Sequence, residues 1–117
     1  MAAVAGRDSS FIEAEELAIR VETDADATII SLYGELDLAS AKAFETAVRH
    51  AEGADTNSIL LDLSGLDFID SSGLAILVRA AIRSRQDSNR LALLRGRDQV
   101  QRLLEVTGLA EELPFID

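Results

Sequence analysis

The sequence of 117 residues has no cysteine, one proline, one histidine and few aromatic side chains. Without cysteine the chain can form no disulfide, no thiolate nucleophile and no metal site with sulfur ligands. The single histidine, His50, cannot hold a metal ion alone, because such sites need several ligands. We therefore expect no bound metal and no cofactor, and a core built mainly from Leu, Ile, Val and Ala.

Long hydrophobic runs are also missing. No apolar stretch approaches the roughly 20 residues that span a bilayer. The first residues, MAAVAGRDSSFIEAEE, have no basic start followed by an apolar run, as a signal peptide would. The sequence predicts a cytoplasmic protein that has no membrane contact.

Positive charge is scarce, and it is unevenly distributed. The formal net charge is −10, with −11 in residues 1–73 and +1 in residues 74–117. An acidic surface repels the phosphate backbone, so we expect no nucleic acid partner. The asymmetry fits either the solvated faces of helices or a protein partner that is attracted by charge.

Hydrophobic spacing predicts one domain, at residues 17–117, after a flexible acidic tail at residues 1–16. Residues 17–22 alternate apolar and polar side chains, which is typical of a half-buried strand. After a turn at residues 23–27, a second strand at 28–36 completes a predicted antiparallel hairpin. Residues 58–63 form a nearly continuous apolar run, which indicates a central strand, and residues 90–94 predict another.

Helical spacing separates these strands. The predicted helices run from Ser40 to a glycine at position 53 that favours a positive φ, over residues 74–86, and from an Asp98–Gln101 capping box to Gly108. Residues 113–117 suggest a short edge segment or a turn. The order predicts an α/β fold: a mixed, mostly parallel sheet with an N-terminal β-hairpin and helices packed against it.

The stretch DFIDSSGL, residues 67–74, follows the central strand and begins a helix. Asp70 or Ser71 can cap the free N–H groups of that helix, and Gly73 allows a close approach of backbone or partner. The same geometry suits a phosphorylated Ser71, because helix N-termini favour negative charge. Both interpretations stay open at this point. Ile76 lies with Ser72 on the predicted polar face of the helix, so it is a candidate docking residue.

Catalytic motifs are hard to find. A nucleophilic serine needs a nearby imidazole, and the only one is His50, in another predicted helix. No phosphate-binding glycine loop occurs, and the only lysine is Lys42. Asp62, Asp67 and Asp70 could collect a metal ion, as in a phospho-accepting receiver domain, but the other acidic and lysine residues of such a site are not visible.

Three segments together resemble a STAS domain: GELD (34–37), LLDLSGLDFIDSSGL (60–74) and LLEVTGLAEELPFID (103–117). They are most similar to the single-domain bacterial anti-sigma factor antagonists, over roughly residues 17–116. The resemblance implies that Ser71 is the phosphorylation site. It also implies that Asp37, Asp70, Ser72 and Gly73 belong to the partner-binding surface.

The resemblance further implies a partner-switching function in transcription regulation during a stress response. The unphosphorylated protein would bind an anti-sigma factor that is also a serine protein kinase, and so release a sigma factor. The kinase would use ATP to phosphorylate Ser71, and a serine phosphatase would reverse this. The chain would then be a monomer or weak homodimer and not an enzyme. The alternatives are a STAS scaffold module of a larger sensory assembly and, less well supported, a phosphate-handling enzyme.

Overall fold

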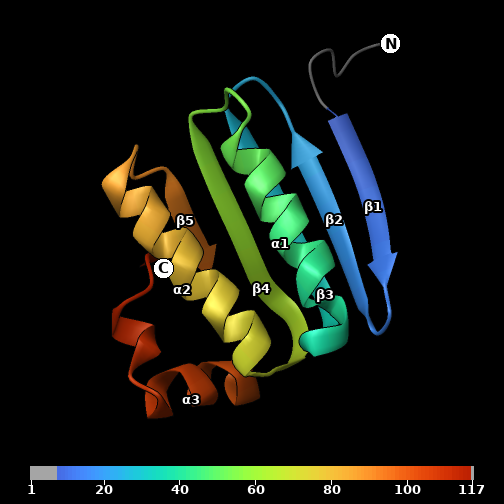
Figure 1. The fold of residues 1–117 in the computed structure, drawn as a ribbon, viewed down its shortest axis with the longest axis vertical. Helices are drawn as coiled ribbons and strands as arrows, with labels where there is room; N and C mark the ends of the chain where they lie inside the picture. Colours follow the sequence, from blue (N-terminus) through green and yellow to red (C-terminus); the bar gives the residue numbers. More distant parts are fainter. Residues whose placement is uncertain (1–7, 117) are drawn as a thin grey trace.

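A computed structural model describes residues 8–116 of the chain. They form a six-stranded sheet in which every strand lies beside its neighbour in the sequence (Figure 1). The strands are β1 (Asp8–Ala14), β2 (Leu17–Thr23), β3 (Ala27–Leu36), β4 (Ser58–Ile69), β5 (Leu91–Leu94) and β6 (Phe115–Ile116). The pairs β1–β2 and β2–β3 are antiparallel, and the other three are parallel. This confirms the predicted mixed, mostly parallel sheet.

The helices are α1 (Leu38–Glu52), α2 (Ser71–Gln86) and α3 (Asp98–Val106), and a short 3-10 helix, η1 (Leu109–Glu111), follows. Figure 1 shows α1 and α2 side by side across one face of the sheet, with α3 at its end. The core lies between the sheet and these helices and consists almost entirely of aliphatic side chains around Phe44. No helix within residues 8–116 is long and apolar enough to cross a membrane.

The predicted hairpin of residues 17–22 and 28–36 is confirmed, but the flexible tail is wrong for residues 8–14. These residues form β1, which pairs with β2 through a two-residue turn. Glu15 in that turn has a φ of 57°, a conformation usually taken by glycine or asparagine, so no ordinary turn signal marks it in the sequence. Residues 1–7 of the predicted tail lie outside the described residues.

Strand β4 runs to Ile69, six residues further than predicted. Its pairing with β3 has two irregularities, one at residues 63–65, which include the polar SG pair, and one at Asp67. The carboxylate of Asp62 accepts hydrogen bonds from both the N–H and the hydroxyl of Ser64. Residues 67–69, which follow the predicted central strand, therefore still belong to β4, and Asp70 alone separates β4 from α2.

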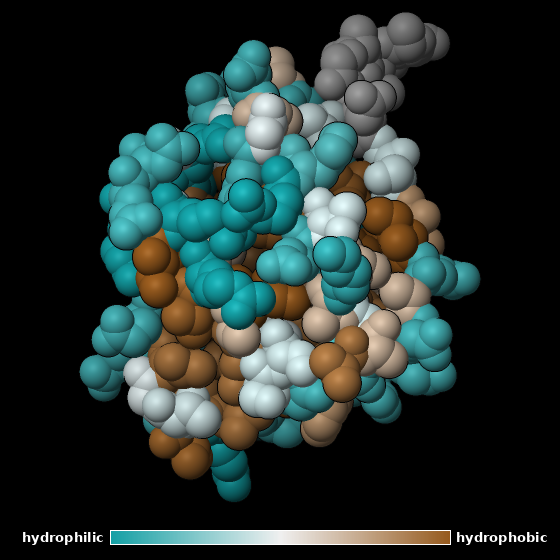
Figure 2. Space-filling model, in the orientation of Figure 1, coloured by the Kyte–Doolittle hydropathy of each residue, from teal (hydrophilic) through white to brown (hydrophobic). Residues whose placement is uncertain are grey.

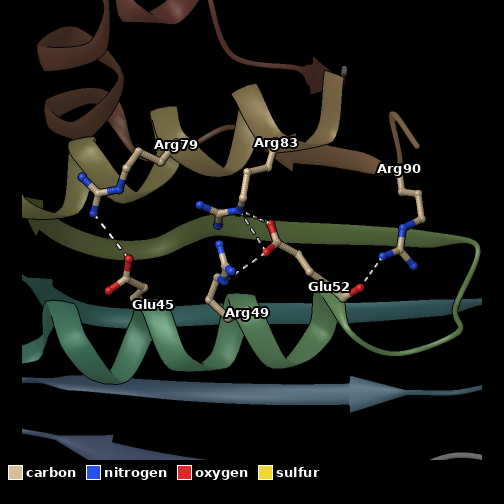
Figure 3. Close-up of polar contacts among 6 residues, drawn as sticks. All are labelled: Glu45, Arg49, Glu52, Arg79, Arg83 and Arg90. Carbon is tan, nitrogen blue, oxygen red and sulfur yellow. Dashed lines mark hydrogen bonds and ion pairs between the residues drawn. The ribbon is translucent and has the colours of Figure 1, made fainter. Parts of the chain in front are cut away.

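Ion pairs join α1 to α2 (Figure 3). Arg79 on α2 contacts Glu45, and Arg83 donates to both carboxylate oxygens of Glu52 at 3.1 Å. Arg90 donates to the carbonyls of Glu52, Ala54 and Thr56 beyond the end of α1. Arginines from the second part of the chain thus neutralise charge and carbonyl dipoles in the first. The charge asymmetry of the sequence is at least partly an internal pairing.

The same pairing corrects the orientation predicted for α2. The face that carries Arg79 and Arg83 turns toward α1, and Ile76 on that face is only 3% exposed. The prediction that Ile76 is an exposed docking residue is therefore wrong. It was based on the polar neighbours of Ile76 in the helix, which bind another helix instead of facing only solvent.

Two predicted helix ends also differ in detail. Gly53 follows α1 as expected, but its φ is −81° and not positive. The N-cap of α3 is Arg97, not Asp98, and no side chain caps it. Gln101 still reaches back, because its side-chain oxygen accepts a hydrogen bond from the N–H of Gly96 at 2.8 Å.

Candidate functional site

Two helix N-termini lie next to each other at one end of the sheet. Strands β3 and β4 are parallel, and their last residues, Leu36 and Ile69, are paired. The N–H of Asp70 donates to the carbonyl of Leu36 at 3.1 Å, which ties the start of α2 to the end of β3. A single residue, Asp37, separates β3 from α1, and a single residue, Asp70, separates β4 from α2. The predicted site residues Asp37 and Asp70 are therefore brought together.

Asp37 is the N-cap of α1. Its carboxylate accepts from the N–H of Ala39 at 3.1 Å, and its own N–H donates to the Ser40 hydroxyl at 3.1 Å. This is a capping box with serine in place of the usual glutamate. Because Asp37 is only half-buried, its carboxylate caps the helix and also faces solvent beside the start of α2.

Asp70 is the N-cap of α2. Its carboxylate accepts from the N–H of Ser72 at 2.8 Å and from the N–H of Gly73 at 3.3 Å. The next N–H, of Leu74, makes the first helical bond, to the Asp70 carbonyl. Of the two residues predicted as possible caps, Asp70 therefore takes the role, and Ser71 is left free.

Ser71 is the first residue of α2, and it is exposed, whereas Ser72 is half-buried. Within residues 8–116, no group exchanges a hydrogen bond with the Ser71 hydroxyl. A modifying enzyme could reach that oxygen without unfolding the helix. The two adjacent serines differ in accessibility, which the sequence alone did not reveal.

Gly73 is buried inside the domain. A Cβ added there would lie 2.6 Å from Cγ of Leu36 and 2.9 Å from Cγ1 of Ile69. The close approach predicted for Gly73 is therefore made by the ends of β3 and β4, which allows α2 to start directly against the sheet.

Exposed apolar side chains beside these helix starts were not among the predicted site residues. Leu38, the first residue of α1, is 78% exposed, and Phe68, near the end of β4, is 47% exposed. A large apolar side chain is unexpected at both positions. Leu38 directly follows the cap of α1, and Phe68 occupies a position of β4 that faces solvent. Their positions next to Asp37 and Asp70 could have suggested them. Asp37, Leu38, Phe68, Asp70 and Ser71 all lie at the ends of β3 and β4 or at the helix starts that follow them, and we call this acidic and apolar group the helix-start surface.

The carboxylates considered for a metal ion are used otherwise. Asp62 binds Ser64, Asp70 caps α2, and Asp67 pairs with Arg97 from the N-cap of α3. Within residues 8–116, no group of three or more His, Cys, Asp and Glu side chains could hold a metal ion.

The geometry of the helix-start surface offers an accessible hydroxyl and a contact area for another protein.

Comparison with known proteins gives a consistent picture. The family model described as "STAS domain" matches residues 18–117. The "Anti-sigma-B factor antagonist" of Listeria monocytogenes is 31% identical over 90 residues, which cover 77% of this chain and 79% of that protein.

Two solved structures have the same fold. An anti-sigma factor antagonist from Mycobacterium paratuberculosis superposes with a TM-score of 0.75 at 24% identity, over 89% of each chain. The Bacillus cell fate determinant SpoIIAA in its phosphorylated form superposes with a TM-score of 0.64 at 22% identity, over 85% of this chain and 91% of that one.

Proposed function

Because the chain belongs to the STAS domain family, we propose that it is an anti-sigma factor antagonist whose partner binds the helix-start surface. The Listeria relative, named as an anti-sigma-B factor antagonist, supports the class of partner. The observation that carries the proposal is the free, exposed Ser71 hydroxyl at the first position of α2, directly after the capping residue Asp70.

In this proposal the unphosphorylated chain binds an anti-sigma factor, which is then no longer available to its sigma factor. The anti-sigma factor is also a serine kinase and transfers a phosphate from ATP to Ser71. A serine phosphatase removes it again. The catalytic groups belong to these partners, and the STAS chain supplies the acceptor oxygen and the contact surface.

The capping of α2 supports an electrostatic switch. A phosphate near a helix N-terminus is usually stabilised by free N–H groups, but here the Asp70 carboxylate already accepts from Ser72 and Gly73. Phosphorylation adds roughly −1.5 to −2 charges beside Asp70 and near Asp37. A partner surface that packs on the exposed apolar Leu38 and Phe68 would have to bury this charge beside them, so an apolar or acidic partner surface would bind the phosphorylated chain less well.

The partner contacts follow from exposure. Asp37, Asp70 and Ser71 meet the anti-sigma factor directly, and Leu38 and Phe68 supply the apolar part of the interface. Ser72 contributes at its edge. Gly73 acts indirectly, because it sets the position of α2 against Leu36 and Ile69.

Phosphorylation with the anti-sigma kinase of the same organism and ATP tests the acceptor. Intact-mass spectrometry should show one added phosphate on the wild type and on Ser72→Ala, and none on Ser71→Ala. Phosphate on Ser71→Ala but not on Ser72→Ala would show that the acceptor is Ser72.

Calorimetry tests the switch. Ser71→Asp should weaken binding of the kinase by at least about tenfold, which corresponds to about 1.4 kcal/mol. Ser58→Asp is the matched control, because Ser58 is exposed at the opposite end of β4 and receives the same charge. Equal affinities for both variants would refute binding at the helix-start surface.

A further inference from the structure

The two edges of the sheet are protected very differently. Strand β6 is two residues long and directly follows Pro114, so it offers little backbone for pairing. Strand β1 is seven residues long, and it contains neither lysine nor proline. Its acidic residues are at position 8 and at Glu13, which leaves an uncharged centre from Ser9 to Ile12. Such an edge is open to another strand.

Both faces of β1 carry an exposed apolar side chain at this centre. Phe11 is 59% exposed and Ile12 is 39% exposed. On the side of Ile12, an open groove of about 700 Å³ lies between the β1–β2 hairpin and α1, lined by Ile12, Val21 and Ala47 among others. Figure 2 shows apolar side chains gathered over this part of the molecule.

The hairpin determines which backbone groups of β1 are free. The residues that flank a two-residue turn, here Ala14 and Leu17, form a hydrogen-bonded pair. Ile12 and Ser10 therefore also bond to β2, because bonded pairs alternate along an antiparallel ladder. The N–H and C=O groups of Ser9, Phe11 and Glu13 point outward, away from the sheet.

We propose that β1 pairs antiparallel with β1 of a second copy of this chain, about a two-fold axis through Phe11. In this register Phe11 is opposite Phe11 of the second copy, and Ser9 is opposite its Glu13. All three outward residues of each strand then form bonded pairs, with about six backbone hydrogen bonds. A two-fold axis is the usual symmetry of a dimer, and the two sheets would become one continuous sheet.

Charge and packing favour a second copy of this chain as the partner of β1, paired in this register. No carboxylate faces another across the axis, whereas a register centred on Glu13 would oppose two of them. Ile12 of each copy would lie beside Ser10 of the other, at the rim of the apolar groove, because paired residues share a face. The helix-start surface stays free, since β2 and β3 separate β1 from β4.

Sedimentation of the purified full chain tests the dimer. We expect a concentration-dependent monomer–dimer equilibrium for the wild type. Phe11→Glu should be monomeric, because two carboxylates would then meet on the axis. Within its own chain that carboxylate would face Arg20, the partner of position 11 in the hairpin, so the thermal stability should be kept. Phe11→Leu, the apolar control, should still dimerise. A wild-type chain that stays monomeric up to about 1 mM, or a Phe11→Glu dimer, would overturn the proposal.

Cysteine substitution tests the register, since the chain has no cysteine of its own. In a hydrogen-bonded antiparallel pair the Cα atoms are about 5.5 Å apart, which a disulfide can span. Phe11→Cys should therefore cross-link on oxidation. Glu13→Cys should not, because its two thiols would lie on Cα atoms roughly 14 Å apart. The reverse result would refute pairing centred on Phe11.

Discussion

Replacing Gly73 by alanine should destabilise the domain, although alanine is the better helix former. A Cβ at this position would lie 2.6 and 2.8 Å from Cγ and Cδ2 of Leu36 and 2.9 Å from Cγ1 of Ile69. Both side chains are almost fully buried, at 0% and 2% exposure, so they have little room to move. The methyl group must push α2 away from the ends of β3 and β4.

The expected size follows from two opposing terms. Overpacking a rigid core costs typically 1–3 kcal/mol, and the alanine gains about 1 kcal/mol of helix propensity. Because Gly73 lies in the first turn of α2, where propensity counts less, we expect a net loss of about 1–2 kcal/mol in the free energy of unfolding. For a domain of this size the melting temperature should fall by about 4–8 °C.

Gly53→Ala is the matched control. Gly53 lies just after α1 at a φ of −81°, and an added Cβ would be 3.6 Å from the nearest atom, the carbonyl oxygen of His50. Alanine fits there without strain, so stability should be unchanged or rise by up to about 1 kcal/mol. Urea unfolding of the two variants beside the wild type measures both effects.

The comparison can refute the reasoning. If Gly73→Ala were as stable as Gly53→Ala but failed to bind the anti-sigma factor, Gly73 would act at the surface and not in packing. If Gly73→Ala lost stability while its folded fraction still bound normally, the packing role would be supported. A concentration series at low temperature separates affinity from the folded fraction.

Two further pairs of substitutions test contacts away from the helix-start surface. Glu52→Gln removes the carboxylate that accepts from Arg83 and pairs with Arg49, and urea unfolding should show a loss of about 1–2 kcal/mol, because Arg83 is only 29% exposed. Glu45→Gln, whose pair with Arg79 is longer and more exposed, should lose less than about 0.5 kcal/mol, and equal losses would refute the distinction. The hydroxyls of Thr28 and Thr56 share a buried hydrogen bond of 3.1 Å, so Thr28→Val should lose about 1–2 kcal/mol in thermal unfolding. The double variant with Thr56→Val should recover part of that loss, and purely additive losses would show that the pair is not coupled.

The order of strands and helices could be predicted from the sequence because most elements are strongly periodic. The alternation at residues 17–22 and the apolar run at 58–63 both predicted strands that the structure contains. Strand β1 was missed for a physical reason. β1 pairs with β2 only, at the edge of the sheet, and its apolar residues Phe11 and Ile12 stay exposed. The turn that joins β1 to β2 consists of two glutamates. Ladder hydrogen bonds hold such a strand, and they leave no hydrophobic pattern.

The candidate site was predicted in part. The motif identified Asp70, Ser71 and Gly73 at a helix start, and the structure divides them into a cap, an exposed hydroxyl and a packing position. Asp37 followed from the resemblance alone, since only the parallel pairing of β3 with β4 brings it near. Ile76 was misplaced because a single helix cannot show which of its faces meets another helix. Leu38 and Phe68 were missed because their exposure depends on the ends of β3 and β4.

The ion pairs between α1 and α2 also bear on how the chain matures on the ribosome. The carboxylates of Glu45 and Glu52 emerge first, and their arginines follow 34 and 31 residues later. Until Arg79 and Arg83 leave the exit tunnel, the nascent segment carries most of the negative charge of the protein without these counter-charges. These ion pairs can therefore form only after β4 and α2 have been synthesised.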